Sequence, residues 1–183
     1  MSDEALKARL PLLERDEAAE ELQPLYDKLL VERGVVPNMF KALANVPGLP
    51  QGVAAFLKPL LSDGALAGWY KELLSIRVAS LNDCEYCVSA HRYSAKQKGA
   101  SAGQIEGVDN FESGPFTERE KAGFRYAELL HASGHAIDDA AYAAASAHFN
   151  AAELIELTMV AAAFEMFPRF NTAFRIPVTK LPE

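Results

Sequence analysis

Apolar residues recur every three or four positions along most of the chain, which is the period of one face of an α-helix. In residues 16–32, for example, leucines and a tyrosine share one side while charged residues occupy the other. Glycine and proline residues interrupt the pattern and separate the helices. The pattern predicts helices over residues 16–32, 38–45, 51–61, 65–81, 83–99, 117–131, 138–148 and 150–167.

Local signals mark several boundaries of these helices. Three predicted starts have the form of a capping box, in which a polar side chain precedes a glutamate by three positions. These pairs are Asn82 with Glu85, Thr117 with Glu120, and Asn150 with Glu153. The stretch 107–115 holds three Gly or Pro residues and few apolar ones, so we predict a surface loop there. Pro168 is expected to end or kink the last helix, because proline has no backbone N–H to donate.

The predicted fold is all-α, in a single domain over residues 1–183. No segment shows the alternation of a strand, apart from an extended tail over residues 176–181. One internal similarity suggests a two-fold repeat of a helical unit. Glu72-Leu73 and Glu156-Leu157 each begin a stretch of similar length and apolar character. Alanine-rich helices resemble one another by composition, so the sequence leaves this repeat open.

Composition and charge narrow the class of protein. Half of the residues are apolar, yet no window approaches the roughly 18 consecutive apolar residues of a membrane span. The formal net charge of −7 disfavours a nucleic-acid backbone as partner. The N-terminal residues open with acids and show no basic start before an apolar stretch, so we expect no secretory signal and a cytoplasmic protein.

The two cysteines of the chain, Cys84 and Cys87, form a CxxC motif that His91 follows four residues later. These three positions fall near one face of a helix, so both thiols and the imidazole can meet at one place. In a reducing compartment such a pair is more often redox-active or metal-binding than structural. Haem attachment would need the histidine directly after the second cysteine, and a thioredoxin-like site would need a preceding strand, so neither fits.

Redox chemistry requires a thiolate, and a free thiol with a pKa of about 8.5 is only about 3% ionised at neutral pH. A helix N-terminus supplies ~0.3–1 kcal/mol, whereas lowering the pKa to about 6 takes roughly 3.4 kcal/mol. His91, one turn beyond Cys87, can accept the thiol proton or pair with the anion. Glu72 lies in the preceding helix, and a tight turn at residues 82–83 would bring it close enough to orient His91 or relay its proton.

The segment from Glu72 to His91 resembles the E-x(11)-C-x-x-C-x-x-x-H signature of the AhpD-like alkylhydroperoxidase branch of the carboxymuconolactone decarboxylase superfamily. Residues 36–43, with the sequence VPNMFKAL, and the following Pro47 are similar to the early helical region of the peroxidase-related members. The resemblance implies an all-helical fold built of a repeated unit. It also implies a homo-oligomer, a trimer or a hexamer.

In that family the second cysteine attacks a peroxide and the first forms a disulfide with the resulting sulfenic acid. The resemblance therefore implies that Cys87 attacks, Cys84 resolves, His91 is the base and Glu72 is its partner. It further implies a small-molecule hydroperoxide as substrate, an external dithiol as reductant and no cofactor. The chain departs from the family pattern at Tyr86. The best-characterised members carry a histidine at this position, as part of the proton relay. A phenol with a pKa of about 10 is a poor proton shuttle at neutral pH.

Other interpretations remain open at this stage. The decarboxylase branch works without a cysteine pair, so the motif argues against lactone decarboxylation. Cys84, Cys87, His91 and Glu72 are also suitable ligand types for zinc, and a helical oligomer that binds metal or senses redox state without turnover is the main alternative. The cysteines can equally be two small buried apolar residues. A further alternative is an enzyme with the same fold that acts on a different small substrate.

Residues outside the motif carry weaker signals. Four aromatic side chains are candidates for lining a pocket, although core packing explains each of them as well: Phe56, Trp69, Tyr86 and Tyr93. Arg169 and Asn171 are polar residues in an apolar context and can reach a site. The remaining histidines show no partner in the sequence, and we expect structural or solvent-exposed roles for His131, His135 and His148.

Overall fold

The computed structural model describes residues 7–182, and this part of the chain forms nine α-helices and three short 3₁₀ helices without a strand. The α-helices are α1 (Gln23–Arg33), α2 (Asn38–Leu43), α3 (Leu49–Leu61), α4 (Gly68–Leu81), α5 (Glu85–Gln97), α6 (Ala102–Gly107), α7 (Glu118–Ala132), α8 (Asp139–Ser146) and α9 (Ala151–Phe174). The 3₁₀ helices are Glu20–Leu22, Val108–Asn110 and Gly134–Ala136. The prediction of an all-α fold is confirmed.

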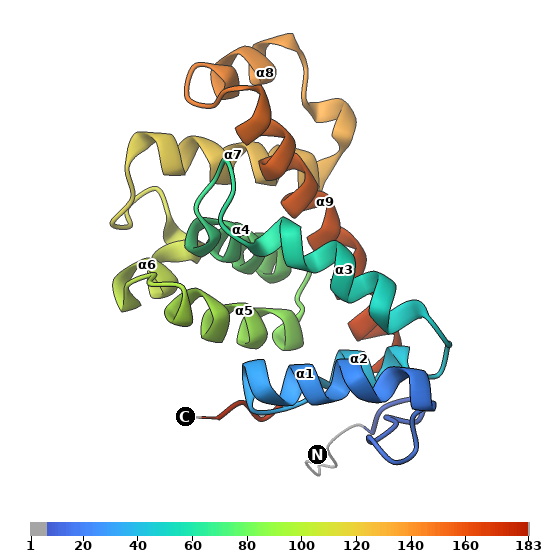
Figure 1. Cartoon of the computed structure of the whole chain (residues 1–183). Coiled ribbons are helices and arrows are strands. Elements are labelled where there is room, and N and C mark those ends of the chain that lie inside the picture. The colour runs from blue at the N-terminus through green and yellow to red at the C-terminus, as the bar shows by residue number, and fades with distance from the viewer. Residues whose placement is uncertain (1–6, 183) are drawn as a thin grey trace, which may run out of the picture.

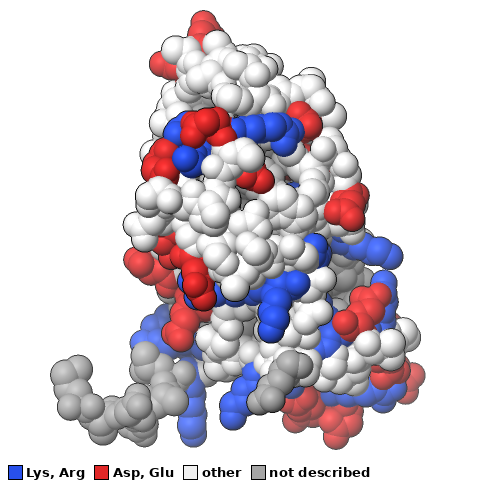
Figure 2. All heavy atoms as spheres, turned by 90° about the vertical axis from the view of Figure 1, so that its left-hand side faces the viewer, with Lys and Arg blue, Asp and Glu red and all other residues white. Residues whose placement is uncertain are grey.

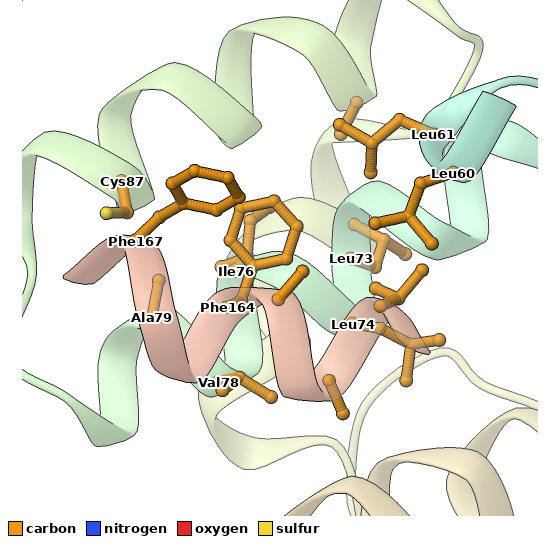
Figure 3. Packing of buried hydrophobic residues seen from close by; sticks show 14 of the residues in the cluster. Leu60, Leu61, Leu73, Leu74, Ile76, Val78, Ala79, Cys87, Phe164 and Phe167 are labelled. Atoms are coloured by element: carbon orange, nitrogen blue, oxygen red, sulfur yellow. The ribbon is translucent and has the colours of Figure 1, made fainter. Parts of the chain in front are cut away.

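Helix α4 lies at the centre of the arrangement and packs against α5, α7 and α9 (Figure 1). Its apolar side chains Leu73, Leu74 and Ile76 are completely buried. They belong to a core that also takes in the rings of Phe164 and Phe167 on α9 (Figure 3). A helix that is covered on nearly every side is held by packing rather than by its own propensity, so α4 is a rigid support for the residues that it carries.

The structure tests the three predicted capping boxes. The capping boxes at Thr117 and Asn150 are confirmed, because each side chain accepts a hydrogen bond from the third residue of its helix and the glutamate there bonds back. The box predicted for Asn82 with Glu85 is wrong. The Asn82 side chain instead donates a hydrogen bond of 2.9 Å to the carbonyl of Val78 in the preceding helix. Helix α5 therefore has a different cap.

Two features between α5 and α7 differ from the prediction. Helix α6 is absent from the predicted set, although Ser101 and Gln104 form a capping box at its start. This helix is short and buries a single apolar side chain, so it leaves almost no periodic signal. The predicted loop over residues 107–115 is only partly a loop, since it contains a 3₁₀ helix and buries Val108 and Phe111.

The C-terminal part also departs from expectation. Helix α9 does not end at Pro168 but continues for six more residues, to Phe174. The tail over residues 176–181 forms no strand. Of the two similar stretches, the one from Glu72 crosses the turn between α4 and α5, whereas the one from Glu156 lies within the continuous α9. The two stretches therefore do not share a helix-loop-helix form.

A buried ion pair joins α4 to α9. The fully buried Lys71 places its Nζ atom 2.6 Å from the carboxylate of Glu156. The same carboxylate accepts hydrogen bonds from the backbone N–H groups of Ala65 and Leu66, at 3.1 and 2.9 Å. A Cβ atom at Gly64 would overlap this carboxylate and displace it. The pair fixes α4, which carries Glu72, relative to α9, which carries Asn171.

Charged side chains are distributed rather than gathered on the face of the molecule in Figure 2, where acidic and basic groups alternate. Such a surface offers no extended patch of one sign on this face. Within residues 7–182, no helix combines the length and the apolar character needed to cross a membrane.

Candidate functional site

The two cysteines lie where α4 turns into α5. Asp83 adopts a left-handed conformation with φ of 51°, which reverses the chain after α4. Cys84 is the N-cap of α5, and its sulfur accepts a hydrogen bond of 3.3 Å from the backbone N–H of Cys87. The motif thus occupies the first turn of the helix, as predicted. The capping position is filled by a cysteine instead of Asn82.

Cys84 and Cys87 form a disulfide, with their Cα atoms 5.3 Å apart. Both are almost completely buried, with exposed fractions of 3% and 2%. A bridge that closes so short a loop constrains little of the unfolded chain, so it contributes little to stability through loop closure. The structure therefore shows the cysteines joined by a disulfide rather than as two independent apolar residues.

A cavity of about 550 Å³ opens beside Cys87. Its inner wall is buried and largely apolar, and it includes Phe40 of α2, Leu61 of α3, and Phe164 and Phe167 of α9. Six lining residues are exposed and mark the side that faces solvent, which we call the mouth: Lys28, Glu32, Ala55, Lys58, Ser62 and Lys98. The cavity therefore connects solvent to one of the two sulfurs through an apolar space.

His91 lines this cavity and is held from behind by Glu72. The Glu72 side chain, only 1% exposed, places one carboxylate oxygen 2.5 Å from Nδ1 of His91 and the other 2.5 Å from Nζ of Lys98. Burial raises the pKa of Glu72, but the charges and hydrogen bonds of His91 and Lys98 outweigh this effect and hold the pKa below its usual range. Glu72 is thus an ionised carboxylate inside the core.

This arrangement fixes the chemistry open to His91. Its Nδ1 atom is engaged with Glu72, so Nε2 is the nitrogen left to exchange a proton with a molecule in the cavity. The ring also packs edge-on against Phe164, with the ring centroids 4.3 Å apart. Among residues 7–182, no hydrogen bond joins His91 to either sulfur in this disulfide form. Direct contact between the imidazole and Cys87 is therefore not a feature of the oxidised state.

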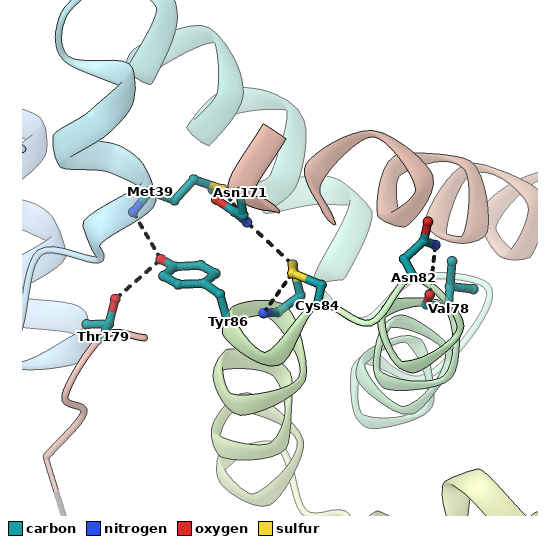
Figure 4. Close-up of a disulfide and its surroundings, with 8 residues drawn as sticks. Met39, Val78, Asn82, Cys84, Tyr86, Asn171 and Thr179 are labelled. Carbon is teal, nitrogen blue, oxygen red and sulfur yellow. Dashed lines mark hydrogen bonds between the residues drawn. A yellow bond between two sulfur atoms is a disulfide. The ribbon is translucent and has the colours of Figure 1, made fainter. Parts of the chain in front are cut away.

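The polar neighbour of the Cys87 sulfur is Asn171, from the last turn of α9 (Figure 4). Its Nδ2 atom lies 3.4 Å from the sulfur and 3.9 Å from the sulfur of Met39. Asn171 is only 2% exposed, and its Oδ1 atom is buried without a hydrogen-bond partner in the described part of the chain. A buried amide oxygen of this kind is costly to leave unpaired, so it can accept a hydrogen bond from a molecule bound beside the sulfur.

Tyr86, between the cysteines, has a different role from that of a proton shuttle. Its hydroxyl accepts hydrogen bonds from the backbone N–H of Met39, at 3.1 Å, and from the Thr179 hydroxyl, at 3.3 Å (Figure 4). Burial raises the pKa of Tyr86, while these hydrogen bonds lower it less. The phenol is thus neutral near pH 7, and it ties α5 to α2 and to the C-terminal segment.

The structure shows which of the remaining candidate residues reach the cavity. Tyr86 lines the cavity, whereas Phe56, Trp69 and Tyr93 are not among its lining residues. Arg169 is exposed and bonds to Glu165 on its own helix, so it does not reach the site.

One prediction about the other histidines is wrong. His131 does have a partner, since its Nδ1 atom lies 2.6 Å from a carboxylate oxygen of Glu165. His135 and His148 are exposed, as expected.

Lys98 is the residue that the sequence did not indicate. It lies 26 positions after Glu72, so only the packing of α5 beside α4 reveals that the two residues are partners.

The metal alternative requires free thiolates, and both sulfurs are engaged in the disulfide. Among residues 7–182, no group of three or more His, Cys, Asp and Glu side chains is arranged to hold a metal ion.

Comparison with known proteins places this site in context. Residues 47–129, which include Glu72, both cysteines and His91, match the Carboxymuconolactone decarboxylase family. The uncharacterized protein YnjA of Escherichia coli (strain K12) is 30% identical over 117 residues, which make up 62% of this chain and 64% of that protein. The match thus spans less than two thirds of the length of this curated relative.

Several solved structures have the same fold. An uncharacterized peroxidase-related protein from Ralstonia eutropha JMP134, described as an alkylhydroperoxidase AhpD core, has a TM-score of 0.87 and 21% identity, covering 94% of this chain and 93% of its own. One from Silicibacter sp. TM1040 has a TM-score of 0.88 and 22% identity, covering 98% and 95%. A variant of the debrominase Bmp8 in complex with 2,3,4-tribromopyrrole has a TM-score of 0.83 and 17% identity, covering 96% and 94%. The predicted AhpD-like fold is confirmed.

The lowered pKa of Glu72 predicts a specific pH dependence of stability. The stabilisation by the ionised carboxylate is fully present above the pKa of an unfolded glutamate, about 4.3, and is lost as the pH falls through the lower pKa of the folded state. We expect Glu72→Gln to lower the free energy of unfolding by about 3 kcal/mol near neutral pH, because it leaves Lys98 and Nδ1 of His91 without their buried carboxylate partner. This difference should shrink in acid.

Urea unfolding of both proteins, from about pH 7 to about pH 3, measures this difference. Glu106→Gln, at an exposed position of α6, is the matched control and should stay within about 0.5 kcal/mol of the unaltered protein. A difference between Glu72→Gln and the unaltered protein that does not change with pH would contradict an ionised Glu72.

Proposed function

We propose that this chain, whose residues 47–129 match the Carboxymuconolactone decarboxylase family and whose fold is AhpD-like, is a thiol-dependent peroxidase. It reduces hydrogen peroxide or alkyl hydroperoxides through Cys87 and Cys84. The observation that carries the proposal is the disulfide at the start of α5, with Cys87 facing a cavity that His91 also lines. A reducing compartment such as the cytoplasm, where dithiols are available, suits this cycle.

The reaction begins with the Cys87 thiolate, which attacks one oxygen of the hydroperoxide. The S–O bond forms as the O–O bond breaks, and the leaving alkoxide takes up a proton to become an alcohol. Cys87 is then a sulfenic acid. The Cys84 thiol attacks its sulfur, the disulfide forms, and the hydroxyl leaves with a proton as water. An external dithiol restores both thiols by exchange and is itself oxidised to a disulfide.

Cys87 is the better candidate for the attacking residue because it lines the cavity, whereas Cys84 does not. Cys84 lies behind it as the helix cap, so it can approach the oxidised sulfur without leaving the first turn. This division matches the roles that the family resemblance implies.

His91 and Glu72 handle the protons in this proposal. His91 Nε2 takes the proton of the Cys87 thiol, directly or through a water molecule, and returns one to the leaving oxygen. Glu72 fixes the tautomer through Nδ1 and stabilises the imidazolium that forms. Tyr86 takes no part, because its hydroxyl is bonded to the backbone and to Thr179.

Asn171, which the sequence indicated only as a polar residue in an apolar context, supplies a hydrogen-bond donor to Cys87. Its Nδ2 group, at 3.4 Å, faces the Cys87 sulfur from α9. Hydrogen bonds to a charged group contribute about 1.5–3 kcal/mol. Such a donor therefore adds to the effect of the helix N-terminus, which is by itself too weak to generate the thiolate.

In the non-catalytic alternative, the cysteine pair binds metal or senses redox state. This alternative involves the same two cysteines but no catalytic turnover of a substrate. A peroxidase differs from it by sustained consumption of hydroperoxide in the presence of excess dithiol. The proposed assignment also excludes lactone decarboxylation as the reaction of this cysteine pair.

We expect the reduced protein to consume cumene hydroperoxide continuously with dithiothreitol as reductant, followed through loss of the hydroperoxide. Cys87→Ser should reduce the rate to the uncatalysed level, because the attacking sulfur is gone. Cys84→Ser should allow one turnover and leave a sulfenic acid on Cys87, detected by dimedone labelling and mass spectrometry. If Cys87→Ser turns over as fast as the unaltered protein, the peroxidase proposal is wrong.

The two groups assigned to Cys87 predict a second result. In a Cys84→Ser background, His91→Ala and Asn171→Leu should each raise the pKa of the Cys87 thiol by about one unit, because each removes a group that stabilises the anion. Thiolate absorbance against pH measures this pKa without any turnover. Arg92→Ala, at an exposed position beside His91 that does not line the cavity, is the control. An unshifted thiol in both variants contradicts these roles.

We also propose that the protein is a homo-oligomer, a trimer or a hexamer. Support comes from an exposed apolar stripe on α9, at positions spaced by four, three and four residues: Ile155, Met159, Ala162 and Met166. Ile155 is 64% and Met166 is 52% exposed. A continuous exposed apolar stripe on a helix whose opposite face packs into the core is typical of a contact between subunits.

Light scattering coupled to size-exclusion chromatography tests this assembly. We expect Met159→Glu to lower the measured mass to that of smaller species, because it places a charge at the centre of the stripe. Val31→Glu, at an exposed apolar position on α1, should leave the mass unchanged. A monomeric unaltered protein, or a Met159→Glu oligomer of unchanged mass, contradicts the proposed contact.

A further inference from the structure

The cavity beside Cys87 is much larger than hydrogen peroxide needs. Its volume is about 550 Å³, whereas a molecule of the size of water occupies about 30 Å³ of liquid volume. Cavities of roughly 300–1,000 Å³ with apolar walls are typical of sites that enclose an organic molecule. The inner wall is built from Phe40, Leu61 and Phe167, among others, which offer contacts only to an apolar body. If the proposed peroxidase function holds, the substrate has such a body.

The charges around the cavity have the opposite sign to those of the whole protein. The chain has a net charge of −7, yet the mouth carries three lysines and one glutamate. Two of these lysines already face acids, since Lys28 lies 3.8 Å from Glu32 and Lys98 is bound to Glu72. Lys58 forms no salt bridge within residues 7–182.

Arg33 adds a second unmatched cation further inside. It is half-buried at the end of α1, lines the cavity, and forms no salt bridge in the described part of the chain. Its charge acts on the Tyr86 phenol, whose pKa is raised by burial and lowered by its hydrogen bonds and by Arg33. A guanidinium that is partly withdrawn from water next to an apolar wall favours a bound carboxylate, with which it can form two parallel hydrogen bonds.

The far end of the cavity supplies the complementary polar contact. The Oδ1 atom of Asn171 is buried without a partner, on the residue whose Nδ2 atom faces the Cys87 sulfur. The O–H group of a hydroperoxide is a donor that can satisfy this acceptor. Its O–O bond would then lie next to the sulfur. The cavity thus has an acceptor beside the sulfur, largely apolar walls, and the cationic groups of Arg33 and Lys58 among its lining residues.

We propose that the preferred substrate is an organic hydroperoxide that also carries a carboxylate. Its apolar body fills the cavity, its hydroperoxide end meets Cys87 and Asn171, and its carboxylate is bound by Arg33 and Lys58. This inference rests on the proposed peroxidase function for its chemistry, but the recognition of an apolar anion can be measured without turnover.

The kinetic test compares two probes of the same shape, cumene hydroperoxide with a para-carboxylate and the methyl ester of that compound. We expect kcat/KM to be about tenfold higher for the acid than for the ester, as one good charge-assisted contact would give. In Arg33→Gln and Lys58→Gln this acid-to-ester ratio should fall toward one. In the matched controls Arg92→Gln and Lys96→Gln, at exposed positions of α5 that do not line the cavity, the ratio should be unchanged.

A binding measurement separates this inference from the peroxidase proposal. Calorimetric titration of the disulfide form with decanoate and with decanol should show tighter binding of decanoate, by about tenfold, and Arg33→Gln should remove the difference. If neither hydroperoxide is reduced but decanoate still binds more tightly, the peroxidase function fails and the anion site stands. If the ester is reduced as well as the acid and decanoate binds no better than decanol, the anion site is wrong and the peroxidase function stands.

Discussion

The buried carboxylate of Glu72 is the constraint from which the geometry of the site follows. An ionised carboxylate is tolerated in a core only when it is paired and hydrogen-bonded. Here both partners come from α5 or its C-terminal cap, since His91 lies in the helix and Lys98 directly follows it. One hydrogen bond and one ion pair spaced along α5 and its cap fix the rotation and the height of this helix against α4. The side of α5 that carries Cys87 and His91 is thereby turned toward the cavity.

The first turn of α5 combines structural and chemical roles in the same atoms. The Cys84 sulfur accepts the hydrogen bond that a capping side chain would otherwise accept, so the resolving cysteine of the proposed cycle is also part of the helix start. Asp83 pays the conformational cost of the left-handed turn that makes this possible. The Tyr86 hydroxyl further ties this turn to α2 and to the C-terminal segment.

Sequence periodicity and spacing were sufficient for the parts of the fold that repeat locally. The long helices and the position of Cys87 and His91 on the side of α5 that lines the cavity follow from residue spacing within one helix. The start of α5 was misjudged because Asn82 can bond either forward or backward, and tertiary packing chose the carbonyl of Val78. Helix α6 was missed because a six-residue helix has too few apolar positions to show a period.

The polar residues around the site were harder to find, because their partners are distant in sequence. Lys98 lies 26 positions from Glu72, and Asn171 lies 84 positions from Cys87. A Lys at a helix end is normally solvated, so the local pattern does not single out Lys98, and it indicates Asn171 only through its polarity in an apolar context. Only the packing of α9 over α5 shows that Asn171 is buried against a sulfur.

The replacement of a relay histidine by Tyr86 is consistent with this arrangement. In the position before Cys87, a side chain is directed toward α2 and the C-terminal segment, where Met39 and Thr179 bind the phenol. A tyrosine there strengthens the attachment of α5, and in the proposed mechanism it leaves one proton path, through His91 and Glu72. Because that path depends on a carboxylate that also holds the helix in place, proton transfer and stability are coupled in the same interaction.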